Sequence, residues 1–261
     1  MRQLLSLFVV SVWATSVVRA DESTIAVMVN GRPTKLASFS AYTSRRASAL
    51  AVESGGAFFA GGGGTVIKCD GQGKMIWKTV VGTAEDEITA LKASLGGVYV
   101  ACTRNYRGKD KFPVAFQLGK SGRIVWKAKL ERFRDAEYVT DDGGGNCFVS
   151  GHTKSGELFV THLDAKGVAQ WHKELKAPKI SDDEAASADA DENFYAFFAV
   201  KGGRLVLTYP FQADSKHTFY ELDLRSGALL KSYTKVWNGA VNLPWSAKDG
   251  KGREYVIRDS G

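Results

Sequence analysis

KCDGQGKMIW at residues 68–77 is the first of three copies of one phrase, followed by QLGKSGRIVW at 117–126 and HLDAKGVAQW at 162–171. In each copy a turn ends in Gly, and Trp follows four residues later. A weaker copy, ELDLRSGALL at 221–230, carries Leu230 where we expect the Trp. Self-similarity at a period of roughly 20–50 residues indicates a repeat architecture. The constant position of the Trp predicts that it packs between neighbouring units.

A second phrase runs out of phase with the first, and it consists of a polar or Gly-rich turn followed by alternating apolar residues. Its copies are ESGGAFFAG (53–61), SLGGVYVAC (94–102), DGGGNCFVSG (142–151), DADENFYAFF (189–198) and KDGKGREYVI (248–257). Short aromatic and β-branched segments bounded by Gly, Asp and Asn are typical of β-strands. Two strand pairs per repeat predict an all-β chain, a β-propeller with five four-stranded blades.

The predicted blades form a single domain over 21–261. They lie near 45–81, 86–130, 135–176, 182–234 and 242–261. The last of these lacks outer strands, and residues 23–39 offer a hairpin around Asn30-Gly31, a favoured two-residue turn. We expect these N-terminal strands to complete the last blade and close the ring, which removes an exposed sheet edge. The alternative is a shortened version of a longer propeller.

Residues 85–95, EDEITALKASL, are open to two interpretations. Ile88, Leu91 and Leu95 recur at helical spacing. The place of the segment in the repeat instead favours a loop followed by an inner strand, and we adopt that interpretation.

The first 20 residues have the features of a secretory signal peptide. Arg2 precedes an apolar run from Leu4 to Val18, and Val18-Arg19-Ala20 fits a cleavage site before Asp21. The run is short for a membrane span, and no other stretch approaches the required length. We therefore expect a secreted or periplasmic protein with no membrane span in its mature chain.

The net charge bears on the class of partner, and the cysteines bear on whether the chain contains disulfides. The formal net charge of +7 is spread along the chain, so we expect no nucleic-acid partner. The densest basic stretch, RNYRGKDKF at 104–112, combines basic and aromatic residues that could bind a polyanion, but we favour the interpretation that it is an exposed loop between two strands of the second blade. Cys69, Cys102 and Cys147 lie in predicted strands without a C-x-x-C pair, so we expect buried free thiols.

Three aspartates recur at one position of the repeat. Asp86, Asp135 and Asp182 each stand 11 residues before the residue that precedes the apolar strand of the second phrase, which is Gly97, Asn146 and Asn193 respectively. On loops that enter the inner strands they would circle one mouth of the channel, where carboxylates could hold a metal ion. They could equally cap turns by bonding backbone amides, and their repetition in register favours this structural role.

Aromatic residues outside the repeat register are the candidates for ligand binding. Trp237 and Trp245 flank a loop, while Tyr209, Phe211 and His217 belong to an insertion at 209–220. Inserted loops carry specificity in many proteins. Together these five residues could contact a glycan or a protein.

Residues 141–171, DDGGGNCFVSGHTKSGELFVTHLDAKGVAQW, resemble the repeat of a family of bacterial-type secreted β-propellers, which is similar in appearance to quinoprotein-like propellers. The matching positions are Asp141, Gly145, Asn146, Phe148, Val149, Gly151, Leu163, Asp164, Gly167 and Trp171. The match is good over the third blade, recognisable in the first two and weak in the last two. It implies a propeller on a secreted or envelope protein, with no shared catalytic residues.

The sequence contains no phosphate loop and no nucleophile with an evident base, so we assign no catalytic residue. These observations favour a monomeric, non-catalytic scaffold without a cofactor, which binds an extracellular or envelope protein or a glycan. One alternative is a carbohydrate-binding or carbohydrate-active propeller. Another is a quinone- or metal-dependent enzyme with its cofactor in the channel.

Overall fold

The computed structural model describes residues 23–29, 32–39, 47–130, 132–176, 197–210, 216–236 and 246–259. These residues form five antiparallel sheets of four strands each, and no helix occurs among them. The predicted all-β class is therefore confirmed. Four of the sheets each consist of four consecutive strands, and the fifth combines strands from the two ends of the described chain.

The sheets are numbered along the chain. Sheet 1 contains β3 (Ala49–Val52), β4 (Phe58–Gly62), β5 (Thr65–Cys69) and β6 (Met75–Val80). Sheet 2 contains β7 (Glu87–Ser94), β8 (Gly97–Arg104), β9 (Phe112–Gly119) and β10 (Ile124–Lys129). Sheet 3 contains β11 (Phe133–Asp141), β12 (Cys147–Thr153), β13 (Leu158–Leu163) and β14 (Ala169–Leu175). Sheet 4 contains β15 (Phe197–Lys201), β16 (Arg204–Pro210), β17 (Lys216–Asp223) and β18 (Leu229–Val236), and sheet 5 contains β19 (Ser246–Lys248), β20 (Glu254–Asp259), β1 (Ser23–Val29) and β2 (Arg32–Ser38).

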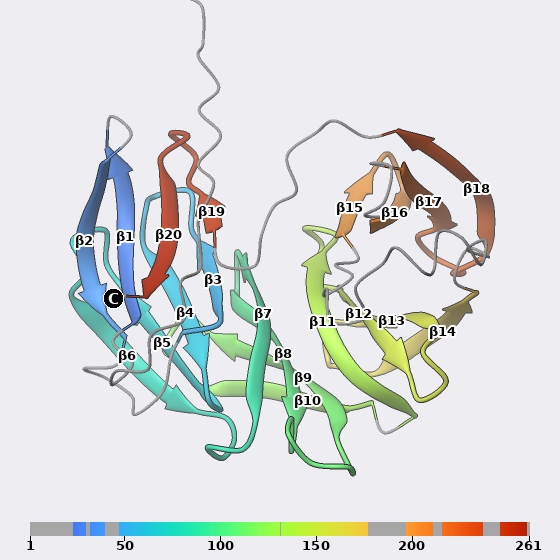
Figure 1. Cartoon of the computed structure of the whole chain (residues 1–261), viewed down its shortest axis with the longest axis horizontal. Helices are drawn as coiled ribbons and strands as arrows, with labels where there is room; N and C mark the ends of the chain where they lie inside the picture. The colour runs from blue at the N-terminus through green and yellow to red at the C-terminus, as the bar shows by residue number, and fades with distance from the viewer. Residues whose placement is uncertain are drawn as a thin grey trace, which may run out of the picture.

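The sheets are arranged as propeller blades. Figure 1 shows β3, β7 and β11 towards the middle and β2, β6, β10, β14 and β18 on the outside. Neighbouring sheets meet through their inner strands, because β19 contacts β3, β3 contacts β7, β7 contacts β11 and β11 contacts β15. Sheets 5 and 4 lie at the two ends of the resulting arc in Figure 1. Closure of the ring between these two sheets stays a prediction.

The segment with two interpretations is a strand. Residues 87–94 form β7, the inner strand of sheet 2, and Ile88 is fully buried. Its apolar residues do not alternate cleanly because the register of β7 against β8 shifts between Ile88 and Ala90. Its helical spacing is overridden by tertiary packing.

The N-terminal strands complete the last sheet, as the sequence predicts. β1 pairs antiparallel with β20 from Ser23 opposite Asp259 to Val27 opposite Tyr255. Ile25 and Tyr255 are fully buried in the cluster that joins sheet 5 to sheet 1. Strands from the two ends of the chain therefore share one sheet and one core.

The repeated Trp residues pack between sheets. The indole of Trp77 covers Gly122 in the turn of sheet 2, Trp126 covers Gly167 in sheet 3, and Trp171 covers Gly227 in sheet 4. Each of these glycines has a positive φ, between 68° and 82°, and a Cβ there would lie within 3.0 Å of the indole. Glycine is therefore needed at this position of the repeat for two reasons: the turn has a positive φ, and the Trp of the preceding sheet leaves no room for a Cβ.

Leu230 does not occupy the Trp position of sheet 4, which corrects the sequence alignment. Trp77 lies opposite Lys68 and Trp171 lies opposite His162, whereas the residue opposite Glu221 is Lys231. The turn of sheet 4 is one residue longer, so Lys231 stands where the other sheets have Trp. Leu230 is 51% exposed.

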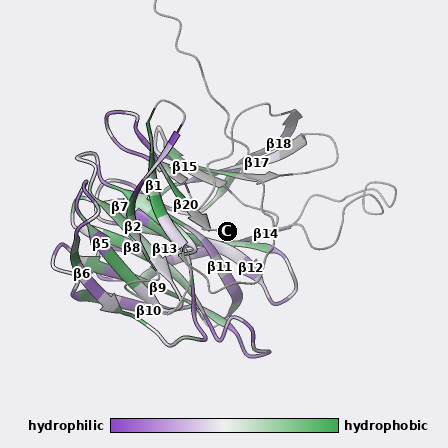
Figure 2. Ribbon diagram, turned by 60° about the vertical axis from the view of Figure 1, so that its left-hand side comes forward, coloured by the Kyte–Doolittle hydropathy of each residue, from purple (hydrophilic) through white to green (hydrophobic). Residues whose placement is uncertain are grey.

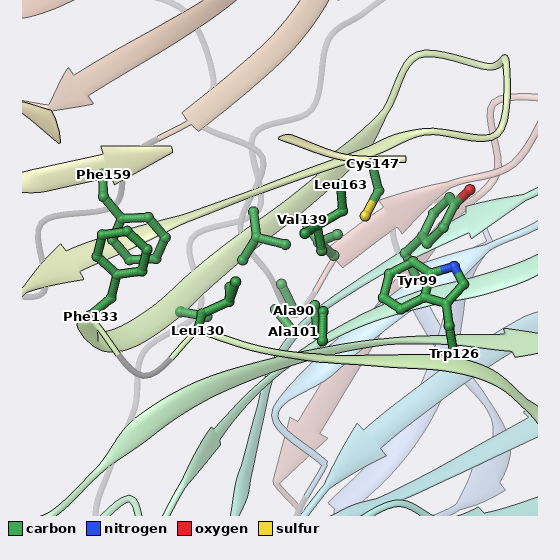
Figure 3. Close-up of a cluster of buried hydrophobic side chains, with 14 residues drawn as sticks. Ala90, Tyr99, Ala101, Trp126, Leu130, Phe133, Val139, Cys147, Phe159 and Leu163 are labelled. Carbon is green, nitrogen blue, oxygen red and sulfur yellow. The ribbon is translucent and has the colours of Figure 1, made fainter. Parts of the chain in front are cut away.

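The core consists of clusters that fill the seams between sheets. Figure 3 shows one of them, in which Tyr99 and Trp126 of sheet 2 lie near Cys147 and Leu163 of sheet 3, while Phe133 stacks on Phe159 at the other end of the cluster. Residue hydropathy follows this arrangement: β5 and β8 are largely hydrophobic, while several of the loops are hydrophilic (Figure 2). Stability therefore rests on burial of apolar surface between sheets.

The three cysteines are buried and unbonded to one another, as expected. Burial raises the pKa of Cys69 and of Cys102 to about 12, and it also raises that of Cys147. Thiols with such pKa values stay protonated at neutral pH and are poor nucleophiles. The cysteines belong to the core.

Candidate binding site on the entry face

The loops that follow even-numbered strands lie at one end of the sheets, because antiparallel strands alternate in direction. They include the loops β6–β7 (81–86), β8–β9 (105–111), β10–β11 (130–132) and β12–β13 (154–157). We call this end the entry face, since its loops lead into the inner strands. The first two loops are joined by a hydrogen bond of 2.9 Å from the Tyr106 amide to the Glu85 carbonyl.

Asp86 holds the β8–β9 loop in place. Its carboxylate accepts hydrogen bonds from the amide of Asn105 at 2.9 Å and from the amide of Thr83 at 2.6 Å, and it forms an ion pair with Arg104. Burial opposes ionisation of this carboxylate, but these amides and the guanidinium outweigh it and lower the pKa of Asp86. A charged, buried aspartate thus fixes the start of the loop.

The loop itself presents a basic and aromatic surface. Asn105 has a φ of 49°, which turns the chain back at the end of β8. Tyr106 is 44% exposed, and Arg107 and Lys109 are exposed beside it. Lys111 lies 5.5 Å from the centre of the Tyr106 ring. The stretch predicted as a loop between two strands of sheet 2 is confirmed, and its shape is fixed at both ends.

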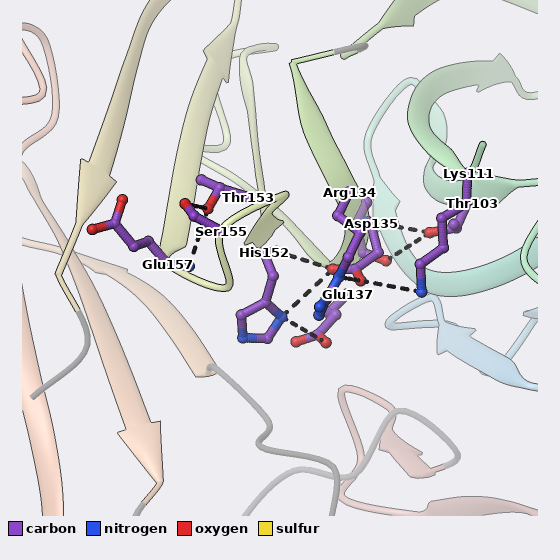
Figure 4. A network of polar contacts seen from close by, with 10 residues as sticks. Thr103, Lys111, Arg134, Asp135, Glu137, His152, Thr153, Ser155 and Glu157 are labelled. Carbon is purple, nitrogen blue, oxygen red and sulfur yellow. Dashed lines mark hydrogen bonds and ion pairs between the residues drawn. The ribbon is translucent and has the colours of Figure 1, made fainter. Parts of the chain in front are cut away.

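A charged cluster lies next to this loop and joins sheet 2 to sheet 3 (Figure 4). Asp135 and Glu137 are on β11, and His152 is on β12. The Nδ1 atom of His152 lies 3.1 Å from Glu137 and 3.5 Å from Asp135. Asp135 also contacts Arg134 at 2.7 Å and Lys111 of the β8–β9 loop at 3.7 Å.

The cluster is charged at neutral pH. Burial lowers the pKa of His152, but hydrogen bonds to Asp135 and Glu137 raise it overall to about 9. Burial likewise raises the pKa of Asp135, yet His152 and Arg134 bring it down to about 2. An imidazolium therefore sits between two carboxylates, with two further cations at Asp135. This arrangement ties the loop to the sheets and makes His152 a hydrogen-bond donor.

Asp135, Glu137 and His152 are also the residues that could hold a metal ion, because one ligand atom from each lies within 4.8 Å of the others. A metal would have to displace the proton of His152, since only the neutral imidazole is a ligand. It would also compete with Arg134 and Lys111 for Asp135. The proton and the basic side chains already supply the positive charge that these carboxylates need.

The free energy of unfolding is expected to fall as the pH rises from about 6.5 to about 9, by up to about 3 kcal/mol. The pKa of His152 is higher in the folded than in the unfolded chain, so its contribution is complete below the unfolded value and is lost as the pH passes the folded one. Urea denaturation of the His152→Gln variant across this range checks the expectation.

In that variant the fall should disappear, whereas the exposed-site control His172→Gln should retain it. A fall of equal size in both variants would contradict the assignment. At the acid end, the contribution of Asp135 should be present above about pH 3.8 and be lost towards pH 2.

The remaining predicted site residues are placed as follows. Asp86 and Asp135 lie at the entry face, Asp86 just before β7 and Asp135 near the start of β11, and each is engaged by its own basic partner. Tyr209 lies in β16 and His217 in β17, but their side chains are not described. Outside the described residues lie Asp182, Phe211, Trp237 and Trp245. The metal and ligand sets therefore stay predictions.

Sequence reasoning missed Glu137 and His152. His152 stands at the end of the second phrase, and its partner residue across the strands is Asp135. β11 has two irregularities in its register against β12, one on each side of this pair. No spacing in the sequence indicates where such irregularities fall, so the cluster is visible only in the folded chain.

The described residues include no helix with the length and hydropathy needed to span a bilayer. No family model matches the chain, and no curated protein matches it either.

Solved structures resemble the chain in fold. A protein of unknown function from Bacteroides caccae superposes with a TM-score of 0.51 at 13% identity, covering 82% of this chain and 73% of that one. Hydrazine synthase of Kuenenia stuttgartiensis gives 0.52 at 17% identity, with 81% and 61% covered. The WD40 domain of Neurospora crassa Pan2 gives 0.50 at 14% identity, with 83% and 57% covered. The chain thus spans less than two thirds of the last two, and at these identities the likeness is one of fold.

Proposed function

We propose that this protein is a monomeric, non-catalytic scaffold that works outside the cytoplasm and binds a partner protein through its entry face. The observation that carries the proposal is the β8–β9 loop, which buried Asp86 holds in one shape while Tyr106, Arg107 and Lys109 face solvent. Loops fixed on a rigid scaffold are common binding elements.

The chemistry of the loop suits a protein partner. Tyr and Arg are enriched among the residues that dominate binding energy in protein interfaces. A loop that is already ordered loses little conformational entropy on binding, which favours affinity. The charged cluster behind it supports this role, because His152 and its carboxylates neutralise one another and brace the loop through Lys111. Their contacts position the loop, and no reaction is assigned to them.

A photo-crosslinking residue at Tyr106, introduced in the cells that produce the protein, tests the proposal. We expect one discrete product of higher mass. The matched control is Leu95, which is 88% exposed in the β7–β8 turn at the opposite end of the sheets. The same label at Leu95 should give no product. Identical products at both positions, or none at either, would argue against the entry face.

The location outside the cytoplasm rests on residues 1–20 and is checked in the same experiment. The exported protein should have the mass of a chain that begins at Asp21. A crosslinked form that retains the first 20 residues in the cytoplasm would overturn this part of the proposal. Turnover of ester or glycoside substrates that is lost in Glu137→Gln would overturn the non-catalytic part.

A further inference from the structure

A pocket of about 560 Å³ opens between sheets 3 and 4, away from the entry-face loop. One wall is the end of β14, and the floor belongs to β17 and β18. Its size falls within the range of about 300–1,000 Å³ that is usual for small-molecule sites. The lining side chains used below are Lys173, Thr218, Tyr220, Leu229, Ser232 and Thr234.

The pocket exists because sheet 4 has short side chains where sheets 2 and 3 have long ones. On the floor, Ser232 lies opposite Tyr220 and Thr234 lies opposite Thr218. The residue that corresponds to Ser232 is His172 in sheet 3 and Lys127 in sheet 2, as judged from the distance to the turn.

Those longer side chains cover neighbouring residues. His172 reaches across to Arg132 at 3.0 Å, and Lys127 lies over the Phe116 ring at 5.7 Å. Ser232 and Thr234 are too short to do so, and the space in front of them remains open.

The wall of the pocket contributes a cation. Lys173 is two residues after Trp171, so both side chains leave the same face of β14, the face that packs on sheet 4. The residues at this place in sheets 1 and 2 are Thr79 and Ala128. Thr79 donates a hydrogen bond of 2.7 Å to the Gly122 carbonyl, which closes its seam, and Ala128 is buried. Between sheets 3 and 4, Lys173 stands at this position instead and faces the open space of the pocket.

The polar groups on the floor are hydroxyls. Thr218 and Thr234 lie 3.1 Å apart through their Oγ1 atoms, and Ser232 is exposed beside them. Tyr220 donates a hydrogen bond of 2.8 Å to the Lys176 carbonyl and closes one end. Glu174 also lines the pocket, but it leaves the opposite face of β14 from Lys173, because neighbouring side chains in a strand alternate.

We propose that this pocket binds an acidic sugar. The carboxylate of the sugar would pair with Lys173, because an ammonium facing hydroxyl groups favours an anion. Thr218, Ser232 and Thr234 can each donate and accept, as the hydroxyls of a sugar ring require. Leu229, which is 44% exposed, offers an apolar contact for the C–H face of the ring. This site lies apart from the entry face, and the inference does not depend on the partner protein proposed there.

Titration of the protein from residue 21 onwards with glucuronic acid tests the inference, with glucose as the neutral probe. Calorimetry or chemical-shift perturbation should show saturable binding of glucuronic acid, at least tenfold tighter than that of glucose. Lys173→Ala should weaken glucuronic acid at least tenfold, whereas the control Lys127→Ala, on the equivalent outer strand of sheet 2, should change it less than twofold. Ser232→Leu, which fills the floor, should abolish binding and leave the thermal unfolding midpoint within a few degrees.

Three results would overturn the inference. The first is equal affinity for glucuronic acid and glucose, because Lys173 would then have no role. The second is displacement by inorganic sulfate at the same concentration as glucuronic acid, which would indicate a site for any small anion. The third is absence of saturable binding by protein whose Tyr106 crosslink still forms, which would remove the sugar site while leaving the proposed scaffold function intact.

Discussion

Replacement of Trp126 by Ala is expected to lower the free energy of unfolding by about 3–5 kcal/mol, the usual cost of removing a large buried aromatic side chain. Trp126 is 7% exposed and belongs to the cluster that joins sheets 2 and 3. Its indole lies 6.0 Å from the Tyr99 ring and covers Gly167 in the turn of the next sheet. Removal of the ring leaves a cavity at a seam whose walls are fixed strands, so the site cannot collapse to fill it. Urea denaturation measures the loss.

Replacement by Phe separates packing from hydrogen bonding. The Nε1 atom of Trp126 is buried without a hydrogen-bond partner, so Trp126→Phe loses volume but no bond. The Nε1 atom of Trp77 donates to the Lys120 carbonyl at 2.9 Å, so Trp77→Phe should lose about 1 kcal/mol through that bond in addition to volume. If Trp126→Ala were no more destabilising than Trp126→Phe, the Trp of the repeat would not be the element that seals the seam.

Replacement of Ile25 by Asp should have a comparable or larger effect, because it places a carboxyl group in an apolar core. Ile25 is fully buried in β1, opposite Ile257 of β20, in the cluster with Phe58 and Tyr255. A buried carboxylate without a partner costs several kcal/mol, whether it stays charged or takes up a proton. We expect β1 to leave sheet 5 and expose the edge of β20, which favours aggregation.

Soluble yield and hydrogen exchange of residues 254–259 measure this outcome. Val29→Asp is the matched control, since Val29 lies on the same strand and is 48% exposed. The control should remain soluble and keep β20 protected. Protection of β20 in Ile25→Asp equal to that in the control would show that the pairing of the two ends of the chain does not stabilise the fold.

Much of the fold could be predicted because its signals are local and repeated. Gly167 and Trp171 mark a turn and the strand after it, and the same phrase returns in the neighbouring sheets. The residue that a turn requires depends on the φ angle at a single position, and strand propensity depends on a few neighbouring residues. Both can therefore be predicted from one sequence. The pairing of residues 23–39 with the last sheet follows from the same count of strands.

Register could not be predicted from these signals. In sheet 3, unbroken pairing around the DAKG turn would place His162 opposite Ala169, but His162 lies opposite Trp171, because the register shifts between His162 and Leu163 beside the turn. In sheet 4 the longer turn moves Lys231 into the place expected for Leu230. A slip of one residue transfers every side chain to the other face of the strand.

The sequence by itself determined the all-β class, the repeat, the packing of the repeated Trp between sheets, the burial of the Cys residues and the completion of sheet 5, because each depends on composition or on spacing along the chain. Only the tertiary structure decided which polar groups lie together: His152 contacts Asp135 and Glu137, and Lys173 lines the same pocket as the hydroxyl groups of sheet 4. Contacts of this kind join strands that are separate in the chain. They depend on strand register and on the size of the side chains that face each other between two sheets. Neither can be predicted from the residues of one strand alone.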